Sequence, residues 1–298
     1  MPESQSQPES PPDLTHRGPR LLGGGGGRGR GAALSTASTV VVIAVIAALF
    51  LLAPGSAQVR HTFFSPADLW QSLIGDPSKG YYSVGAAIWL NIRMFLVAEV
   101  FILVFGLVLA VVKQSTGPVL LPLRVVALVY VDIFRGVPTI LVIYAVGFGL
   151  PALNLTVVST QDPAVYGVIA LVLSYSAYVC EVYRAGINSV PLAQVSAARS
   201  VGLTQPQAMR YVILPQAVRT IIPALLNDFI SLQKDTALVS VLGSIEANRA
   251  AEIYSATVFN YSSYVVAAAL FLILTIPLAR FTDHLIARDR ARRLAGAR

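Results

Sequence analysis

Long apolar stretches alternate with shorter polar ones along most of this chain. No charged residue lies between Arg30 and Arg60, and the apolar stretch within that interval covers about 34–53. Similar stretches follow at about 87–112, 125–150, 165–184, 221–243 and 263–282. Each supplies roughly 20 helical residues at ~1.5 Å of rise per residue, enough to cross a hydrocarbon core of ~30 Å. The pattern predicts an all-α membrane protein with six transmembrane helices.

Composition supports lipid as the solvent for these stretches. Of 298 residues, 55% are hydrophobic and 12% are charged, whereas an ordinary soluble domain has about 25% charged residues. The low charge excludes a soluble globular protein, and the apolar content excludes a disordered one. The one cysteine, Cys180, ends an apolar run that begins at Leu171 and cannot form an intrachain disulfide. We expect it to be a small buried apolar side chain.

The segments outside the spans differ in composition. Residues 1–33 are rich in Ser, Pro and Gly, which predicts a disordered tail. The apolar stretch at 34–53 is too long for the core of a signal peptide, so we interpret it as an uncleaved N-terminal transmembrane helix. Residues 54–86 contain several prolines and are predicted to form an extracytoplasmic loop. Residues 87–283 then form the main transmembrane domain, and 284–298 a basic cytoplasmic tail.

The basic residues determine the predicted orientation. The net charge is +7, which taken alone would suit a nucleic-acid partner. With a cytoplasmic N-terminus, 17 Lys and Arg residues fall on the cytoplasmic side, and only Arg60, Lys79 and Arg249 fall outside. This distribution follows the positive-inside rule. The charge excess therefore predicts a multi-pass protein of a bacterial cell membrane with both termini in the cytoplasm, and gives no reason to expect nucleic acid.

Polar side chains inside the spans are candidates for a transport pathway, because they are costly in hydrocarbon. The candidates are Arg93, Glu99, Asn227, Asp228, Lys234 and Asp235. Arg93 and Glu99 suit a zwitterionic or cationic substrate, and a structural interhelical pair is the alternative. Lys234 and Asp235 either line the pathway or the seam between two subunits, or lie solvated at a helix end. Glu181 and Arg184 have the i, i+3 spacing of a local salt bridge.

The polar segment 189–215 has the signals of two short helices. Ser189 is a predicted N-cap with Pro191 in the first turn, and Gly202 is a predicted C-cap. Thr204 and Gln207 have the spacing of a capping box, and Pro215 is expected to break the second helix. This cytoplasmic segment is either a compact docking element for another protein or an amphipathic connector on the membrane surface.

The same segment resembles the cytoplasmic loop of the integral-membrane permeases of ABC importers. That family has the pattern E-A-A, three residues, G, nine residues, I, one residue, L-P. The corresponding residues here are Ser196, Ala197, Ala198, Gly202, Val212, Leu214 and Pro215. Ser196 replaces a glutamate often used at the contact with the ATPase, and Val212 replaces isoleucine. The resemblance implies that Ser196, Ala197, Ala198, Gly202, Leu214 and Pro215 belong to an ATPase-coupling loop.

Three further motifs resemble those of permeases for polar amino acids. They are Phe134–Pro138 (F-R-G-V-P), Glu181–Ile187 (E-V-Y-R-A-G-I) and Leu232–Ser240 (L-Q-K-D-T-A-L-V-S). The resemblance implies a type I importer permease core of five helices, preceded here by the extra helix at 34–53. It also implies three kinds of partner: a second permease subunit, identical or related, separate ATPase subunits, and an extracytoplasmic solute-binding protein.

Two absences from the sequence bear on catalysis. No phosphate-binding G-x-x-x-x-G-K-[ST] motif occurs, so ATP and Mg are expected on a partner subunit and the chain is not expected to be an enzyme. The three histidines are dispersed and predict no metal site. The rival interpretations are a secondary transporter or channel that works without an ATPase, and a membrane scaffold that moves nothing.

Overall fold

The computed structural model describes residues 28–115, 117–159 and 161–296, and within them the chain is helical. It forms two units, one ending at Ala57 and the other beginning at Gln58. The α-helices are α1 (Arg28–Leu52), α2 (Ser56–Phe63), α3 (Pro66–Ile74), α4 (Val84–Gln114), α5 (Leu121–Gly136), α6 (Thr139–Ala152), α7 (Pro163–Asn188), α8 (Leu192–Ser200), α9 (Gln205–Ala208), α10 (Leu214–Asp235), α11 (Ala247–Val258) and α12 (Ser262–Gly296). Short 3₁₀ or π turns separate some of them: η1 (Pro77–Lys79), η2 (Pro118–Leu120), η3 (Met209–Ile213) and η4 (Thr236–Leu242).

The first unit contains α1. Its segment Ser35–Leu52 is long and apolar enough to cross a membrane, and none of it is buried within the protein. This fits a helix that faces lipid. The helix begins at Arg28, earlier than the position near 34 that the apolar pattern predicts. Of the predicted disordered tail over 1–33, residues 28–33 are helical, and residues 1–27 lie outside the described residues.

Three further helices match predicted spans. Val84–Gln114, Pro163–Asn188 and Ser262–Arg288 are each long and apolar enough to cross a membrane. In place of the predicted loop over 54–86, the chain forms two short helices, α2 and α3, and a 3₁₀ turn. The hydroxyl of Ser65 caps α3 by accepting a hydrogen bond from the backbone of Asp68.

The predicted span at 125–150 is not one continuous helix. Pro118–Gly136 and Thr139–Ala152 meet at an angle of 110°. The cause is Pro138, which disfavours helical geometry at the preceding residue. Val137 is accordingly extended, with φ −94° and ψ 130°. The F-R-G-V-P motif therefore marks a sharp bend, and the two arms count as a single span only if they cross the membrane together.

The predicted span at 221–243 also differs in the structure. The α-helix α10 begins earlier, at Leu214, and ends at Asp235, after which η4 continues as a 3₁₀ helix to Leu242. The hydroxyl of Thr236 donates to the Gln233 carbonyl at this change of helix type, at 2.7 Å. Because α10 contains many polar residues, it is not among the helices that are apolar enough to cross a membrane by themselves. Six crossings therefore remain a prediction.

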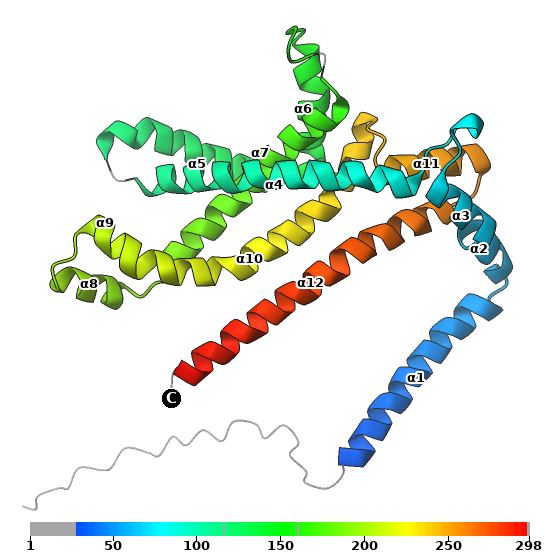
Figure 1. Cartoon of the computed structure of the whole chain (residues 1–298), viewed down its shortest axis with the longest axis horizontal. Helices are drawn as coiled ribbons and strands as arrows, with labels where there is room; N and C mark the ends of the chain where they lie inside the picture. Colours follow the sequence, from blue (N-terminus) through cyan, green and yellow to red (C-terminus); the bar gives the residue numbers. More distant parts are fainter. Residues whose placement is uncertain (1–27, 116, 160, 297–298) are drawn as a thin grey trace, which may run out of the picture. The chain divides into compact units, whose positions relative to one another are not determined.

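The core of the second unit is built around α7, the most buried of the candidate spans. One core cluster joins α7 to α4, α6, α10 and η4, and includes Ile102, Ile143, Leu171, Leu232 and Val239. A second joins α4, α5 and α7 around Cys180, which is a free, buried thiol as predicted. In Figure 1, α8 and α9 lie at one end of α10 and α11 lies near the other.

Small residues allow other elements to approach α7 closely. Gly167 packs against Val239 of η4, and Gly186 packs against Ile221 of α10. A Cβ atom at either glycine would overlap the branched side chain opposite it. These two glycines therefore fix how near α10 and η4 come to α7.

A buried polar network holds the start of α11. The Glu246 carboxylate, which is fully buried, accepts hydrogen bonds from the backbones of Asn248 and Arg249 and from Nδ2 of Asn91. Oδ1 of Asn91 accepts from the backbone of Ala247 at 3.0 Å. One side chain of α4 thus completes the N-cap of α11, which compensates for burying a carboxylate.

Replacing Gly186 by alanine is expected to destabilise the second unit by about 1–3 kcal/mol, because the added methyl group overpacks the contact with Ile221. The measurement is the temperature at which half of the detergent-purified protein stays monodisperse after heating. Gly149→Ala in α6 is the control, since a Cβ there meets no atom within 4 Å. An equal melting temperature for both variants would contradict the tight α7–α10 contact.

Candidate coupling and transport site

The segment between α7 and α10 forms a compact helical turn. Gly202 ends α8 with φ +90°, a left-handed conformation that favours glycine. Its N–H donates to the carbonyl of Arg199, and the N–H of Leu203 donates to that of Ala198. This pair of bonds is the Schellman motif, so the predicted C-cap at Gly202 agrees with the structure.

The predicted start of this helix is wrong. The helix α8 begins at Leu192 after Pro191, not at an N-cap formed by Ser189. Ser189 instead ends α7, and its hydroxyl donates to the Gly186 carbonyl at 2.7 Å. A serine hydroxyl that follows a helix is able to bond to a carbonyl of that helix. Ser189 does so here, and it caps the C-terminus of α7.

The capping box at the second helix is confirmed. Gln207 Oε1 accepts from the backbone N–H of Thr204 at 2.8 Å and from its hydroxyl at 2.9 Å. The predicted break at Pro215 is wrong, however. The chain continues through the π turn η3 into α10, and Pro215 occupies the first turn of that helix, where a missing N–H is tolerated. The π turn is wider than an α-helical turn, and it accommodates the shift in backbone hydrogen-bond register between α9 and α10.

The exposed surface of this segment combines small and large apolar side chains. Five of the predicted coupling residues are exposed: Ser196, Ala197, Gly202, Leu214 and Pro215. Ala198 is buried and packs inside the turn. Sequence reasoning missed Leu192 and Val201, which bracket α8 and are 82% and 79% exposed. The sequence did contain an indication of their role: both are large apolar residues among small and polar ones, in a segment too polar to span the membrane.

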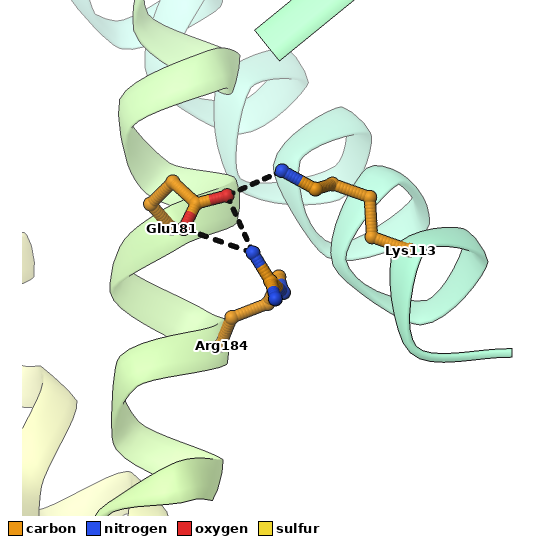
Figure 2. A network of polar contacts seen from close by, with 3 residues as sticks. All are labelled: Lys113, Glu181 and Arg184. Atoms are coloured by element: carbon orange, nitrogen blue, oxygen red, sulfur yellow. Dashed lines mark hydrogen bonds and ion pairs between the residues drawn. The ribbon is translucent and has the colours of Figure 1, made fainter. Parts of the chain in front are cut away.

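The turn is tied to the transmembrane helices at two places. Nε2 of Gln216 on α10 donates to Oε1 of Gln194 on α8 at 2.7 Å. About two turns before the end of α7 at Asn188, Glu181 accepts hydrogen bonds from two cations (Figure 2). Lys113 Nζ of α4 lies 2.6 Å from Glu181 Oε1, and Arg184 Nη1 lies 2.9 Å and 3.0 Å from its two carboxylate oxygens.

The Glu181–Arg184 pair confirms the predicted local salt bridge, whereas Lys113 is an addition that the sequence did not indicate. Only 3% of the Lys113 side chain is exposed, so its charge depends on Glu181 for compensation. The network therefore holds together the ends of α4 and α7 nearest to the coupling turn.

The structure separates the predicted pathway residues into two groups. Glu99 on α4 and Asp228 on α10 are both half-buried, and Asp228 lies close enough to repel the negative charge of Glu99. Asp235 is also half-buried and accepts a hydrogen bond from the hydroxyl of Tyr175 at 2.8 Å. These three carboxylates lie where α4, α7 and α10 pack together.

The second group lies on other surfaces. Arg93 is exposed and lines a groove of ≈600 Å³ between α4 and α7, whose other polar side chain is that of Asp162. Within the described residues neither Arg93 nor Glu99 makes an ion pair, so the alternative of a structural interhelical pair is not observed there. Asn227 and Lys234 are exposed on α10.

Replacing Glu181 by glutamine is expected to cost on the order of 3 kcal/mol, because it leaves the buried Lys113 without a carboxylate. Lys113→Met should cost less than half of this, since Glu181 keeps Arg184. Thermal unfolding of the purified variants measures both effects. Arg249→Gln is the control: it removes a solvent-exposed pair with Glu252 and should stay within about 0.5 kcal/mol. Equal losses for Glu181→Gln and Lys113→Met would contradict the network.

Comparison with known proteins identifies relatives that the chain matches over most of their length. The chain is 37% identical over 191 residues to the probable amino-acid permease protein YxeN of Bacillus subtilis, covering 64% of this chain and 84% of that one. It is 33% identical over 200 residues to the arginine transport system permease protein ArtQ of the same species, covering 67% and 88%.

Solved structures share the fold. A crystal structure of an amino acid ABC transporter with histidines matches with a TM-score of 0.64 and 32% identity, over 69% of this chain and 93% of that chain. An inward-facing MetNI methionine ABC transporter matches with a TM-score of 0.58 at 19% identity, which indicates a shared fold. The sequence profile of the binding-protein-dependent transport system inner membrane components matches residues 119–291. Because this match covers more than half of the chain, the protein belongs to that family of ABC transporter permeases.

Proposed function

We propose that this chain forms the transmembrane pathway of an ATP-driven importer for polar amino acids, as a dimer with an identical or related permease. Membership of the family implies an ATPase and a second permease subunit as partners. Relatives named for amino-acid, glutamine and arginine transport support the substrate class. The observation that carries the proposal is the capped turn at 189–215, which presents Leu192 and Val201 to a partner.

The turn is proposed to dock onto a separate ATPase subunit that binds ATP and Mg. Apolar side chains on a rigid turn lose little conformational entropy on binding, which favours a tight contact. Both termini are then cytoplasmic, in line with the 17 basic residues assigned to that side. A solute-binding protein would deliver the substrate on the opposite, extracytoplasmic side.

Motion of the turn would reach the pathway through α7 and α10. Gln194 and Gln216 connect the turn to α10, and Glu181 connects α7 to α4. Each state of the ATPase must favour one arrangement of these helices for transport to be coupled to hydrolysis. Glu99, Asp228 and Asp235 lie among the same helices, and their carboxylates suit the ammonium group carried by every amino acid.

The direct test is uptake of radiolabelled amino acids by cells that express the chain with its neighbouring subunits, compared with cells that lack it. Uptake that requires both the chain and an ATPase subunit that co-purifies with it supports the proposal. Uptake that persists without any ATPase would instead indicate a secondary transporter or channel. Co-purification without uptake of any amino acid would indicate a scaffold.

Replacing Gly202 by aspartate is expected to reduce uptake about tenfold or more. A tenfold reduction corresponds to a loss of ~1.4 kcal/mol in the coupling free energy between the turn and the ATPase. The substitution strains a left-handed position and adds a charge to the docking surface. Membrane insertion should be unchanged, which quantitative immunoblotting of membranes checks. Gly80→Asp is the matched control: it too is left-handed, with no atom within 4 Å of a Cβ, and lies in the extracytoplasmic segment. Normal uptake by the Gly202 variant would refute the docking role.

The purified chain alone is expected to hydrolyse no ATP, because the nucleotide-binding motif is missing from its sequence. A phosphate-release assay on the chain with and without its co-expressed ATPase measures this. Turnover by the chain alone, after removal of every other subunit, would contradict the requirement for a partner.

A further inference from the structure

A cavity of ≈780 Å³ lies beside the coupling turn and has no role in the mechanism above. It is enclosed by the residues that lead into α8, by the first half of α10, and by α12 near Arg288. The residues that line it are Ser189, Val190, Pro191, Gln194, Gln216, Arg219, Thr220, Ile222, Pro223, Leu226, Leu285, Ile286 and Arg288. It is distinct from the pathway candidates Glu99, Asp228 and Asp235, none of which lines it.

Among the residues that line it, the cavity has two positive charges and no negative one. Arg219 on α10 and Arg288 on α12 both line it, and its lining includes no acidic residue. Within the residues that the structure describes, neither guanidinium lies within ion-pair distance of a carboxylate. Two arginines on different helices that line one cavity are suited to an anion with several oxygen atoms, such as a phosphate.

The depth of the cavity places it at a membrane surface. Arg288 lies on α12 at the far end, counted from Ser262, of a 27-residue stretch that can cross a bilayer, and the helix itself continues to Gly296. At ~1.5 Å per residue these 27 residues extend ~40 Å, beyond a hydrocarbon core of ~30 Å. Arg288 therefore reaches the level of the lipid headgroups. This level is that of the inner leaflet if the orientation under Proposed function holds.

The lining also has polar uncharged side chains, among them Gln194 and Gln216, and a set of apolar ones. Ile222 and Leu226 lie one turn apart on α10, and Leu285 and Ile286 lie on α12 just before Arg288. A small soluble anion would leave these side chains without a complementary partner. An amphiphile, with an anionic head and a hydrocarbon body, matches both parts of the cavity.

We propose that this cavity binds an anionic phospholipid of the inner leaflet. Arg219 and Arg288 hold its phosphate group, and the upper part of an acyl chain packs against Ile222, Leu226 and Leu285. The bound lipid contacts α10, α12 and the residues that enter α8 together. It therefore stabilises their arrangement in proportion to its occupancy.

The test uses the full-length chain, purified in a mild detergent with the subunits that co-purify with it. Phosphatidylglycerol is added, and both the melting temperature and the lipid adducts in native mass spectra are recorded. We expect a rise in melting temperature with phosphatidylglycerol and none with phosphatidylcholine. The double variant Arg219→Gln with Arg288→Gln should weaken phosphatidylglycerol binding at least tenfold.

The matched control is the double variant Arg210→Gln with Arg280→Gln. It removes the same number of exposed cations from the neighbouring elements, and neither arginine lines the cavity. Equal weakening in both double variants would mean general attraction to anionic lipid and would overturn the proposal. So would an equal stabilisation by inorganic phosphate or glycerol phosphate, which would indicate a soluble anion.

Should the first double variant not purify as a monodisperse protein, the single variants Arg219→Gln and Arg288→Gln carry the same comparison. Each should bind phosphatidylglycerol more weakly than Arg280→Gln, and equal binding by all three would overturn the site. Uptake assays separate this result from the transport proposal. Loss of lipid binding with normal uptake would leave the permease function intact.

Discussion

A backbone amide that has left water must find a hydrogen-bond partner within the protein, and this requirement governs where the helices of this chain are able to break. At the break after α10, Asn91 and Glu246 provide hydrogen-bond partners for polar groups of η4 and of the start of α11. At the break between α5 and α6, the bend occurs at Pro138, which has no N–H to satisfy. The break after α10 is buried within the protein, whereas Gly136 and Pro138 at the α5–α6 bend are exposed.

The helices of the second unit are held together in two ways. Around Gly167 and Gly186, close approach and the packing of branched side chains determine the spacing. Between α4 and α7, the charged side chains of Lys113, Glu181 and Arg184 also hold the helices together. Packed glycine contacts tolerate little sliding, whereas an ion network with one partly exposed carboxylate can rearrange. Both kinds of contact occur near the end of α7, because Gly186 and Glu181 lie within about two turns of Asn188.

The sequence predicted features that depend on neighbouring residues better than features that depend on tertiary contacts. The capping box of Thr204 and Gln207, the C-cap at Gly202 and the Glu181–Arg184 pair each span only a few residues, and all three are present. Ser189 was misassigned because two helix ends compete for its hydroxyl, and Pro215 because a proline suits both the end of one helix and the first turn of the next.

The contacts that the sequence could not reveal join residues far apart along the chain. Lys113 and Glu181 are 68 positions apart, and Asn91 and Glu246 are 155 apart. From the sequence, Lys113 was only one more basic residue at a helix end, and its burial depends on how α4 packs against α7. The partners of Glu99 and Arg93 likewise depend on which face of α4 meets α10, and a hydropathy pattern does not contain that information.

The two cations of α4 also limit how this protein is able to move. Arg93 and Lys113 are 20 residues apart, which on a helix corresponds to ~30 Å, the thickness of the hydrocarbon core. Sliding α4 along the membrane normal in either direction would draw one of these charges into hydrocarbon, which is costly. Lys113 extends the same restriction to α7 through Glu181. Tilting or rotation of these helices is therefore a less costly route to alternating access than a piston-like stroke.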